Sequence, residues 1–444
     1  MADVSDIDPC YATIAELSHA FATRALSPVE VTRAHLQRID RLNPVLHPYM
    51  TVLADSALDE ARQAEEQIAR GNHRGRLHGV PIAVKDLCFT QGIPTTAGMA
   101  IHRDFRPSYD ATVVSRLRRA GAVLLGKLHM CEAAGAEYHP DFPAVVNPWS
   151  AERWAGASSS GSAVATVTGL CTASLGSDTG GSIRTPCTMT GATGLKPTWG
   201  RVSVHGVFAM APSLDTIGPM ARNAEDTGHV LRAIAGADPQ DPTATRVGVP
   251  EYATGSPEVR TVRIGFDPEY ALGGVEPDVA RVVRTALRVL ADLGADIREV
   301  SLPSTAALAA GWGGLCGSPN RRRARADLSV PIRGVRPIRK PAPGRRSRGV
   351  RHGDRPHPAR AKPVRRETGG AVRGCRLARR ARLAAGEPDP RSVQGVAVQS
   401  RDSAGLAALH RTVQLLRQPD DHPAGRLRFP RRTDRFPIRG STLR

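Results

Sequence analysis

Residues 156–186 of the chain read GASSSGSAVATVTGLCTASLGSDTGGSIRTP. Gly180 and Gly181 predict a turn with exposed N–H groups, because glycine has no Cβ to block a close approach. Ser182 follows this turn and would lie within reach of a carbonyl group held by those N–H groups, as acyl transfer requires. Asp178 and Arg184 flank the turn and are predicted to pair across it. The stretch therefore predicts a serine nucleophile beside an oxyanion site.

A serine nucleophile without a nearby histidine needs another route for its proton. The first serine cluster, which begins at Ser158, offers a bridging hydroxyl, and Lys85 in GVPIAVKD (79–86) is the candidate base. A lysine acts as a base only when it is neutral, so burial must lower its pKa. The apolar residues 80–84 before Lys85 favour such burial. A Gly-Gly-Ser loop or a single lysine would alone indicate only a turn or a surface charge.

Helix and strand patterns alternate through the first 300 residues, which predicts an α/β fold with a mixed sheet covered by helices on both faces. Ser27 to Glu30 is a capping box with Pro28 at the first helical position. The patterns predict helices over 28–42, 52–70, 112–120, 223–235 and 276–293, and strands over 80–84, 122–125, 262–266 and 297–301.

The ordered motifs GVPIAVKD, GASSSGS, GSDTGGSIRTP and GATGLKPTWGRVS (191–203) resemble the amidase signature family. This family includes bacterial amidases, fatty acid amide hydrolase and the amidotransferase subunit that makes Gln-tRNA. The resemblance covers about residues 10–305 and extends to NPW (147–149) and PSLDTIGPMAR (212–222). It implies the amidase signature fold, an acyl-enzyme mechanism on a small-molecule amide substrate, and no metal or other cofactor.

The resemblance also implies a role for each residue of the motifs. Ser182 matches the nucleophile, Ser158 the bridging serine that the family holds in a cis peptide, and Lys85 the general base. The remaining matches are the oxyanion-hole backbone of Thr179, Gly180, Gly181 and Ser182, the supporting residues Asp178 and Arg184, and Ser159 as a further hydrogen-bonding partner.

The net charge of +19 is confined to the end of the chain. Residues 1–316 contain 28 Lys and Arg against 33 Asp and Glu, whereas residues 317–444 contain 33 against 9. The first part therefore offers no attraction to polyanions, and no nucleic acid partner is expected of it. The start, MADVSDID, has no apolar segment and the seven cysteines are scattered singly, so we expect a cytoplasmic protein without a membrane anchor. The resemblance leaves open whether it forms a homodimer.

Residues 317–444 have a composition unlike that of a folded domain. They contain 31 Arg and 14 Pro, and their only aromatic residues are Phe429 and Phe436. Such a segment is expected to be disordered. Before residue 317 the chain has 3 Lys against 25 Arg, which indicates a GC-rich gene, and a GC-rich gene read in a wrong frame yields Arg, Pro, Gly and Ala. We therefore hypothesise a frameshift near codons 303–320. The predicted domains are 1–316, with a catalytic core at 79–222 and without the family's C-terminal third, and a tail at 317–444.

Four interpretations of the chain remain open at this point. The segment EAAGAEYHPDFPAVVNPW (132–149) favours a stand-alone amidase over the glutaminase subunit of a tRNA-dependent amidotransferase. The third alternative is an inactive product of a frameshifted amidase gene. The fourth is an amidase core fused to a genuine nucleic-acid-binding tail, although the tail lacks the aromatic residues that stack on bases.

Overall fold

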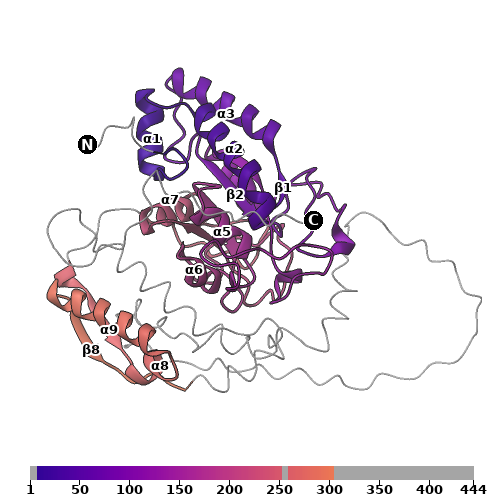
Figure 1. The fold of residues 1–444 in the computed structure, drawn as a ribbon. Helices are drawn as coiled ribbons and strands as arrows, with labels where there is room; N and C mark the ends of the chain where they lie inside the picture. The colour runs from indigo at the N-terminus through magenta and orange to yellow at the C-terminus, as the bar shows by residue number, and fades with distance from the viewer. Residues whose placement is uncertain (1–7, 253–258, 305–444) are drawn as a thin grey trace, which may run out of the picture.

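The computed structural model describes residues 8–252 and 259–304, whose arrangement is shown in Figure 1. A six-stranded sheet with helices around it is followed by a smaller unit of two strands and two helices. The elements run in chain order as α1 (Ile14–Thr23), α2 (Pro28–Leu46), β1 (Tyr49–Val52), α3 (Ala54–Ala69), β2 (Pro81–Lys85), α4 (Thr112–Arg119), β3 (Val123–Leu128), α5 (Ser160–Val167), β4 (Ala173–Ser177), α6 (Arg184–Thr190), β5 (Thr193–Gly194), β6 (Ile217–Ala221), α7 (Ala224–Ile234), β7 (Arg263–Phe266), α8 (Pro268–Leu272), α9 (Pro277–Asp292) and β8 (Asp296–Glu299).

The sheet is mixed, with the strand order β1-β3-β2-β4-β6-β5. At its centre β2 pairs in parallel with both β3 and β4. The outer pairs, β1 with β3, β4 with β6 and β5 with β6, are antiparallel. Parallel neighbours need a connection that returns the chain over a face of the sheet. Here α4 lies in the connection from β2 to β3, and α5 in the connection from β3 to β4.

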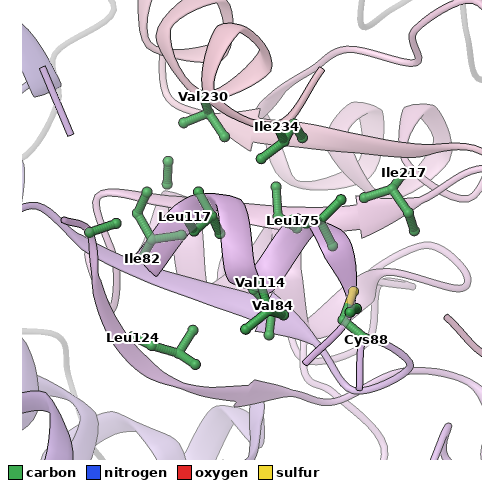
Figure 2. Packing of buried hydrophobic residues seen from close by; sticks show 14 of the residues in the cluster. Ile82, Val84, Cys88, Val114, Leu117, Leu124, Leu175, Ile217, Val230 and Ile234 are labelled. Atoms are coloured by element: carbon green, nitrogen blue, oxygen red, sulfur yellow. The ribbon is translucent and has the colours of Figure 1, made fainter. Parts of the chain in front are cut away.

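Alternate residues of β2 pack into two different cores. Ile82 and Val84 belong to the larger core, which contains side chains of α4 and α7 (Figure 2). Ala83 belongs to a second core with side chains of α2, α3 and α5. Because successive side chains of a strand point to opposite faces, helices cover both faces of the sheet, as predicted. The same alternation places Lys85 on the face that α5 covers.

The capping box predicted at the start of α2 is present. Ser27 Oγ accepts a hydrogen bond from the Glu30 N–H, and the Glu30 carboxylate accepts one from the Ser27 N–H. Pro28 occupies the first helical position, where a backbone N–H has no acceptor within the helix, so the missing N–H of proline costs no hydrogen bond. The helix ends at Leu46, one turn beyond the predicted end, and His47 then adopts the left-handed conformation with φ 56°.

The unit from β7 to β8 has its own small apolar cluster, centred on Ala271, Val283 and Ala286. Its two strands pair in parallel, and Figure 1 shows it to one side of the six-stranded sheet. The predictions of a disordered tail and of a changed reading frame fall on residues 305–444, outside the described residues. The division into a domain 1–316 and a tail 317–444 therefore stays a prediction.

Candidate active site

Lys85 is the last residue of β2, and its side chain is fully buried. The strand before it is buried along its whole length. The prediction that apolar residues carry this lysine into the interior is therefore confirmed. The sheet face on which it lies is covered by α5, which begins at Ser160, directly after the first two serines of the cluster.

Three serine hydroxyls surround the amino group of Lys85. Its Nζ donates hydrogen bonds to Ser158 Oγ at 2.7 Å, to Ser159 Oγ at 2.8 Å and to Ser177 Oγ at 2.8 Å. All three serines are buried, and Ser159 Oγ donates in turn to the Ser177 carbonyl at 3.2 Å. Three acceptors match the three donors that an ammonium group carries. The lysine side chain is thus held in one position.

Ser158 follows a cis peptide bond after Ala157, as the resemblance implied. Its carbonyl accepts a hydrogen bond from the Cys131 N–H at 3.2 Å. Cys131 lies three residues after the end of β3. The serine cluster is therefore attached to the segment that leaves β3 as well as to Lys85.

Ser182 is partly exposed, in contrast to the fully buried Lys85 and Ser158. Its carbonyl accepts a hydrogen bond from the Ser159 N–H at 3.2 Å, which brings the two serine clusters together. Within the part of the chain that the structure describes, we find no hydrogen bond between the hydroxyls of Ser158 and Ser182. The preceding Gly181 has φ +144°, a conformation that residues other than glycine rarely adopt.

Asp178 and Arg184 form the predicted pair across the turn. The Arg184 guanidinium donates from Nε to Asp178 Oδ2 at 2.9 Å and from Nη2 to Oδ1 at 3.0 Å. Asp178 also accepts hydrogen bonds from the N–H groups of Gly181 at 2.8 Å and Ile183 at 3.2 Å. Burial raises the pKa of this carboxyl, but Arg184 and the hydrogen bonds outweigh burial and lower the pKa to about 2. The carboxylate therefore stays charged at neutral pH.

The N–H groups of the turn differ in their availability. The N–H of Gly181 is already bonded to Asp178. Those of Thr179, Gly180 and Ser182 donate to no group among residues 8–252 and 259–304. An oxyanion needs donors that are not otherwise engaged. Three of the four backbone donors expected from the sequence meet this condition.

Burial lowers the pKa of Lys85 to about 7, from an ordinary value of 10.5. The thiolates of Cys131 and Cys88 and the carboxylates of Asp178 and Asp215 would act in the opposite direction, but burial raises the pKa of both thiols to about 12, and these groups do not offset the loss of hydration of Lys85. A lysine with this pKa is about half neutral near pH 7, which suits a general base.

Two residues of the site were not predicted from the sequence. Ser177 supplies the third acceptor for Lys85. Asp215 accepts a hydrogen bond from the Thr179 hydroxyl at 2.6 Å. Both residues lie within quoted motifs, but a serine before an aspartate and an aspartate in a loop carry no distinctive signal of their own. Their roles become visible only from the contacts of the folded chain.

Among the described residues, no group of three or more His, Cys, Asp or Glu side chains is placed to hold a metal ion. In the same part of the chain, no helix has both the length and the apolar character needed to cross a membrane.

Comparison with known proteins gives consistent matches over the described region. The model of the family described as Amidase matches residues 30–317. AmiD of Mycobacterium tuberculosis, which is named an amidase, is 50% identical over 281 residues, covering 63% of this chain and 59% of AmiD. A glutamyl-tRNA(Gln) amidotransferase subunit of Chloroflexus aurantiacus is 45% identical over 296 residues, covering 66% of this chain and 61% of the relative. The chain thus spans less than two thirds of the length of these curated relatives.

Solved structures give the same result for the fold. The native peptide amidase of Stenotrophomonas maltophilia superposes with a TM-score of 0.62 at 30% sequence identity, covering 72% of this chain and 73% of that chain. The mixed sheet with helices on both faces is therefore an arrangement that solved amidase structures share.

Proposed function

The chain belongs to the amidase family, and we propose that it hydrolyses a carboxamide to a carboxylate and ammonia or an amine. The observation that carries this proposal is the buried Lys85, whose pKa is near 7 and whose amino group lies 2.7 Å from Ser158 Oγ. A neutral amine inside the protein, hydrogen-bonded to Ser158 and to Ser159, whose N–H bonds the carbonyl of the partly exposed Ser182, is suited to proton transfer in acyl chemistry.

In the first half of the proposed reaction, neutral Lys85 accepts the proton of the Ser158 hydroxyl while Ser158 accepts that of Ser182. Ser182 Oγ then attacks the amide carbon, and the carbonyl oxygen becomes an oxyanion. This relay requires Ser182 Oγ to approach Ser158 Oγ when substrate is bound. Hydrogen bonds of catalytic groups often tighten only in the complex with substrate.

The oxyanion is proposed to rest on the N–H groups of Thr179, Gly180 and Ser182, which are available, rather than on that of Gly181. The charged pair of Asp178 and Arg184 holds the turn in shape by occupying the Gly181 N–H. Loss of one oxyanion donor typically lowers kcat by about 10²–10³.

In the second half, the C–N bond breaks as the relay returns the proton to the leaving nitrogen, which departs as ammonia or an amine. Water then attacks the acyl carbon and gives up a proton to the same relay. The Ser182 ester bond breaks as the relay returns that proton to Ser182 Oγ, and the product leaves as a carboxylic acid that loses its proton to solvent and becomes the carboxylate. These steps use only the chain's own residues and one water molecule.

A second candidate is the glutaminase activity of an amidotransferase subunit, because such a subunit is 45% identical to this chain. The two candidates are separated by comparing glutamine with simple aliphatic and aryl amides as substrates. Preferential release of ammonia from glutamine would favour the second candidate. We favour the stand-alone amidase, since AmiD is 50% identical.

A fluorophosphonate probe, which labels activated serines, tests the proposal on the full chain. Wild-type protein is expected to be labelled, and Ser182→Ala is expected to lose labelling. Ser162→Ala is the control, because Ser162 lies in the same serine-rich stretch but is buried, and its hydroxyl donates to the Leu175 carbonyl. If the wild-type chain folds but takes up no label, it is the inactive product considered above.

A further inference from the structure

The pairing of β4 with β6 continues one residue beyond the two strands. Ser177, the last residue of β4, is paired with Ile217, the first residue of β6. Beyond them the Asp178 N–H donates to the Thr216 carbonyl at 2.7 Å, so the antiparallel register is still maintained at this point. In an antiparallel ladder, the pair that follows a hydrogen-bonded pair has no backbone bonds but brings its side chains closest together.

That next pair is Thr179 opposite Asp215, and its side chains are bonded. The Thr179 hydroxyl donates to Asp215 Oδ1 at 2.6 Å. The other carboxylate oxygen, Oδ2, accepts from the N–H groups of Met210 at 2.8 Å and Ala211 at 3.0 Å. Asp215 is buried, and these two hydrogen bonds tie it to its own loop. It forms a fixed support for Thr179.

The ladder stops directly after this contact. The following backbone pair would engage the N–H of Gly180, but this N–H donates to no group among the described residues, and neither does that of Thr179. The side-chain bond is thus the last link between the two segments before the turn diverges. It fixes the turn at the residue where unused N–H groups begin.

We infer that Asp215 is a positioning residue, which holds Thr179 so that the N–H groups of Thr179 and Gly180 face the oxyanion of the reaction. The inference rests on the proposed function and extends it to a residue outside the serine–lysine cluster. Asp215 acts through Thr179 and does not itself touch the reacting atoms. Loss of the Thr179 hydroxyl should therefore impair the stabilisation of the oxyanion while it leaves the nucleophile and the base unchanged.

Phosphonylation of Ser182 provides the test, because the probe develops an oxyanion-like oxygen in the same place. Thr179→Val removes the hydroxyl and keeps the branched shape. We expect kinact to fall about 10- to 100-fold with little change in KI, since a displaced donor costs less than a deleted one. Thr179→Ser restores the hydroxyl and is expected to stay within about threefold of wild type. A wild-type kinact for Thr179→Val would overturn the inference, as would an equal loss in Thr179→Ser.

A pH profile separates the role of Asp215 from a general loosening of the loop. The carboxylates of Asp178 and Asp215 raise the pKa of Lys85, and so would the thiolates of Cys131 and Cys88, whose own pKa values are raised to about 12. Asp215→Asn should therefore move the acidic limb of the labelling rate to lower pH, whereas Thr179→Val should leave that limb in place. A shifted limb in Thr179→Val would contradict the inference, because the effect of the substitution would then extend to the base.

The controls distinguish the failure of this inference from the failure of the proposed function. Continued labelling of Ser182→Ala would contradict the nucleophile and, with it, the inference. Loss of labelling in Ser182→Ala, combined with an unchanged rate in Thr179→Val, would overturn the inference alone. Circular dichroism of each variant verifies that it is folded. If Thr179→Val fails to fold, Thr179→Ala takes its place with the same expected outcomes.

Discussion

Lys85 Nζ lies 2.7 Å from Ser158 Oγ, and neither side chain is accessible to solvent. The contact joins the end of β2 to the serine cluster that precedes α5. Because desolvation is the largest influence on Lys85, its protonation depends mainly on the closed packing of this part of the sheet. Ser182, by contrast, is partly exposed.

The first prediction concerns pH. Only neutral Lys85 can accept a proton, so the rate constant for labelling of Ser182 should rise with pH and level off above about 7, the pKa of Lys85. The rate is measured from pH 5 to pH 9. Lys85→Met should lower this rate constant by more than about 10²-fold, the usual contribution of general base catalysis, and the rate constant should no longer rise with pH through 7. A rate that still rises at pH 9 without levelling off would contradict the lowered pKa of Lys85.

A second prediction concerns Ser177, whose hydroxyl is one of the three acceptors of Lys85. Ser177→Ala leaves one donor of the lysine without its partner and frees the side chain to move. We expect about a tenfold fall in kinact, less than for Ser158→Ala, because loss of a typical hydrogen bond costs about 0.5–1.5 kcal/mol. Ser162→Ala, outside this cluster, should match wild type. Equal rates for Ser177→Ala and Ser162→Ala would mean that the third acceptor has no role.

The sequence predicted many of the elements whose apolar residues recur on one face or follow a cap, although α1, which has a capping box of Thr13 and Glu16, was missed. The helices predicted over 112–120 and 223–235 are α4 and α7, and each differs from its prediction by one residue at one or both ends. The Asn223 N-cap that precedes α7 is also present. In contrast, α5 was not predicted as a helix. Its sequence, SGSAVATV, is buried over nearly its whole length and therefore has no polar face to alternate with an apolar one.

The residues of the site likewise fall into those that the sequence could predict and those that it could not. Lys85, Ser158 and Ser182 stand in motifs, so the sequence could mark them. Asp215 could not be linked to Thr179 from the sequence, because 36 residues separate the two and only the register of β4 with β6 brings them together. Contacts between distant segments depend on strand order, and neither composition nor periodicity specifies the strand order.

The third prediction concerns a buried ion pair between Lys127 and Asp86, the residue that follows Lys85. Lys127 Nζ lies 3.2 Å from Asp86 Oδ1, both side chains are fully buried, and the amino group also donates to the Cys88 carbonyl at 2.7 Å. Lys127→Met leaves the Asp86 carboxylate without its cation and should lower the free energy of unfolding by about 3–5 kcal/mol. Adding Asp86→Asn should recover part of this loss. Denaturant unfolding of the single and double variants measures the coupling.

The exposed pair of Arg281 and Asp278 provides the control for that experiment. Its side chains are 68% and 85% exposed, so Arg281→Met should change the free energy of unfolding by less than about 1 kcal/mol. A loss for Lys127→Met no larger than for Arg281→Met would contradict the importance of the buried pair.

The fourth prediction concerns acid stability. The pKa of Asp178 is lowered to about 2 in the folded protein, below the ordinary 3.8, because Arg184 and backbone N–H groups outweigh the effect of burial. A lowered carboxyl pKa stabilises the fold fully above the ordinary value and loses that contribution as pH falls from about 4 to about 2. Asp178→Asn should flatten the fall in unfolding free energy over this range. An unchanged slope would show that the carboxyl does not stay charged below its ordinary pKa.

The last prediction concerns the reading frame. The family match ends at residue 317, inside the window of codons 303–320 where the composition changes. We expect that resequencing codons 300–325 and translating all three frames downstream will give one frame that continues as a lysine-poor sequence with ordinary numbers of aromatic and acidic residues. A chain with that C-terminus should be labelled by the probe faster than the present one. If no such frame exists, residues 317–444 are a genuine part of the product, and their 33 Lys and Arg make salt-dependent binding to a polyanion the next measurement.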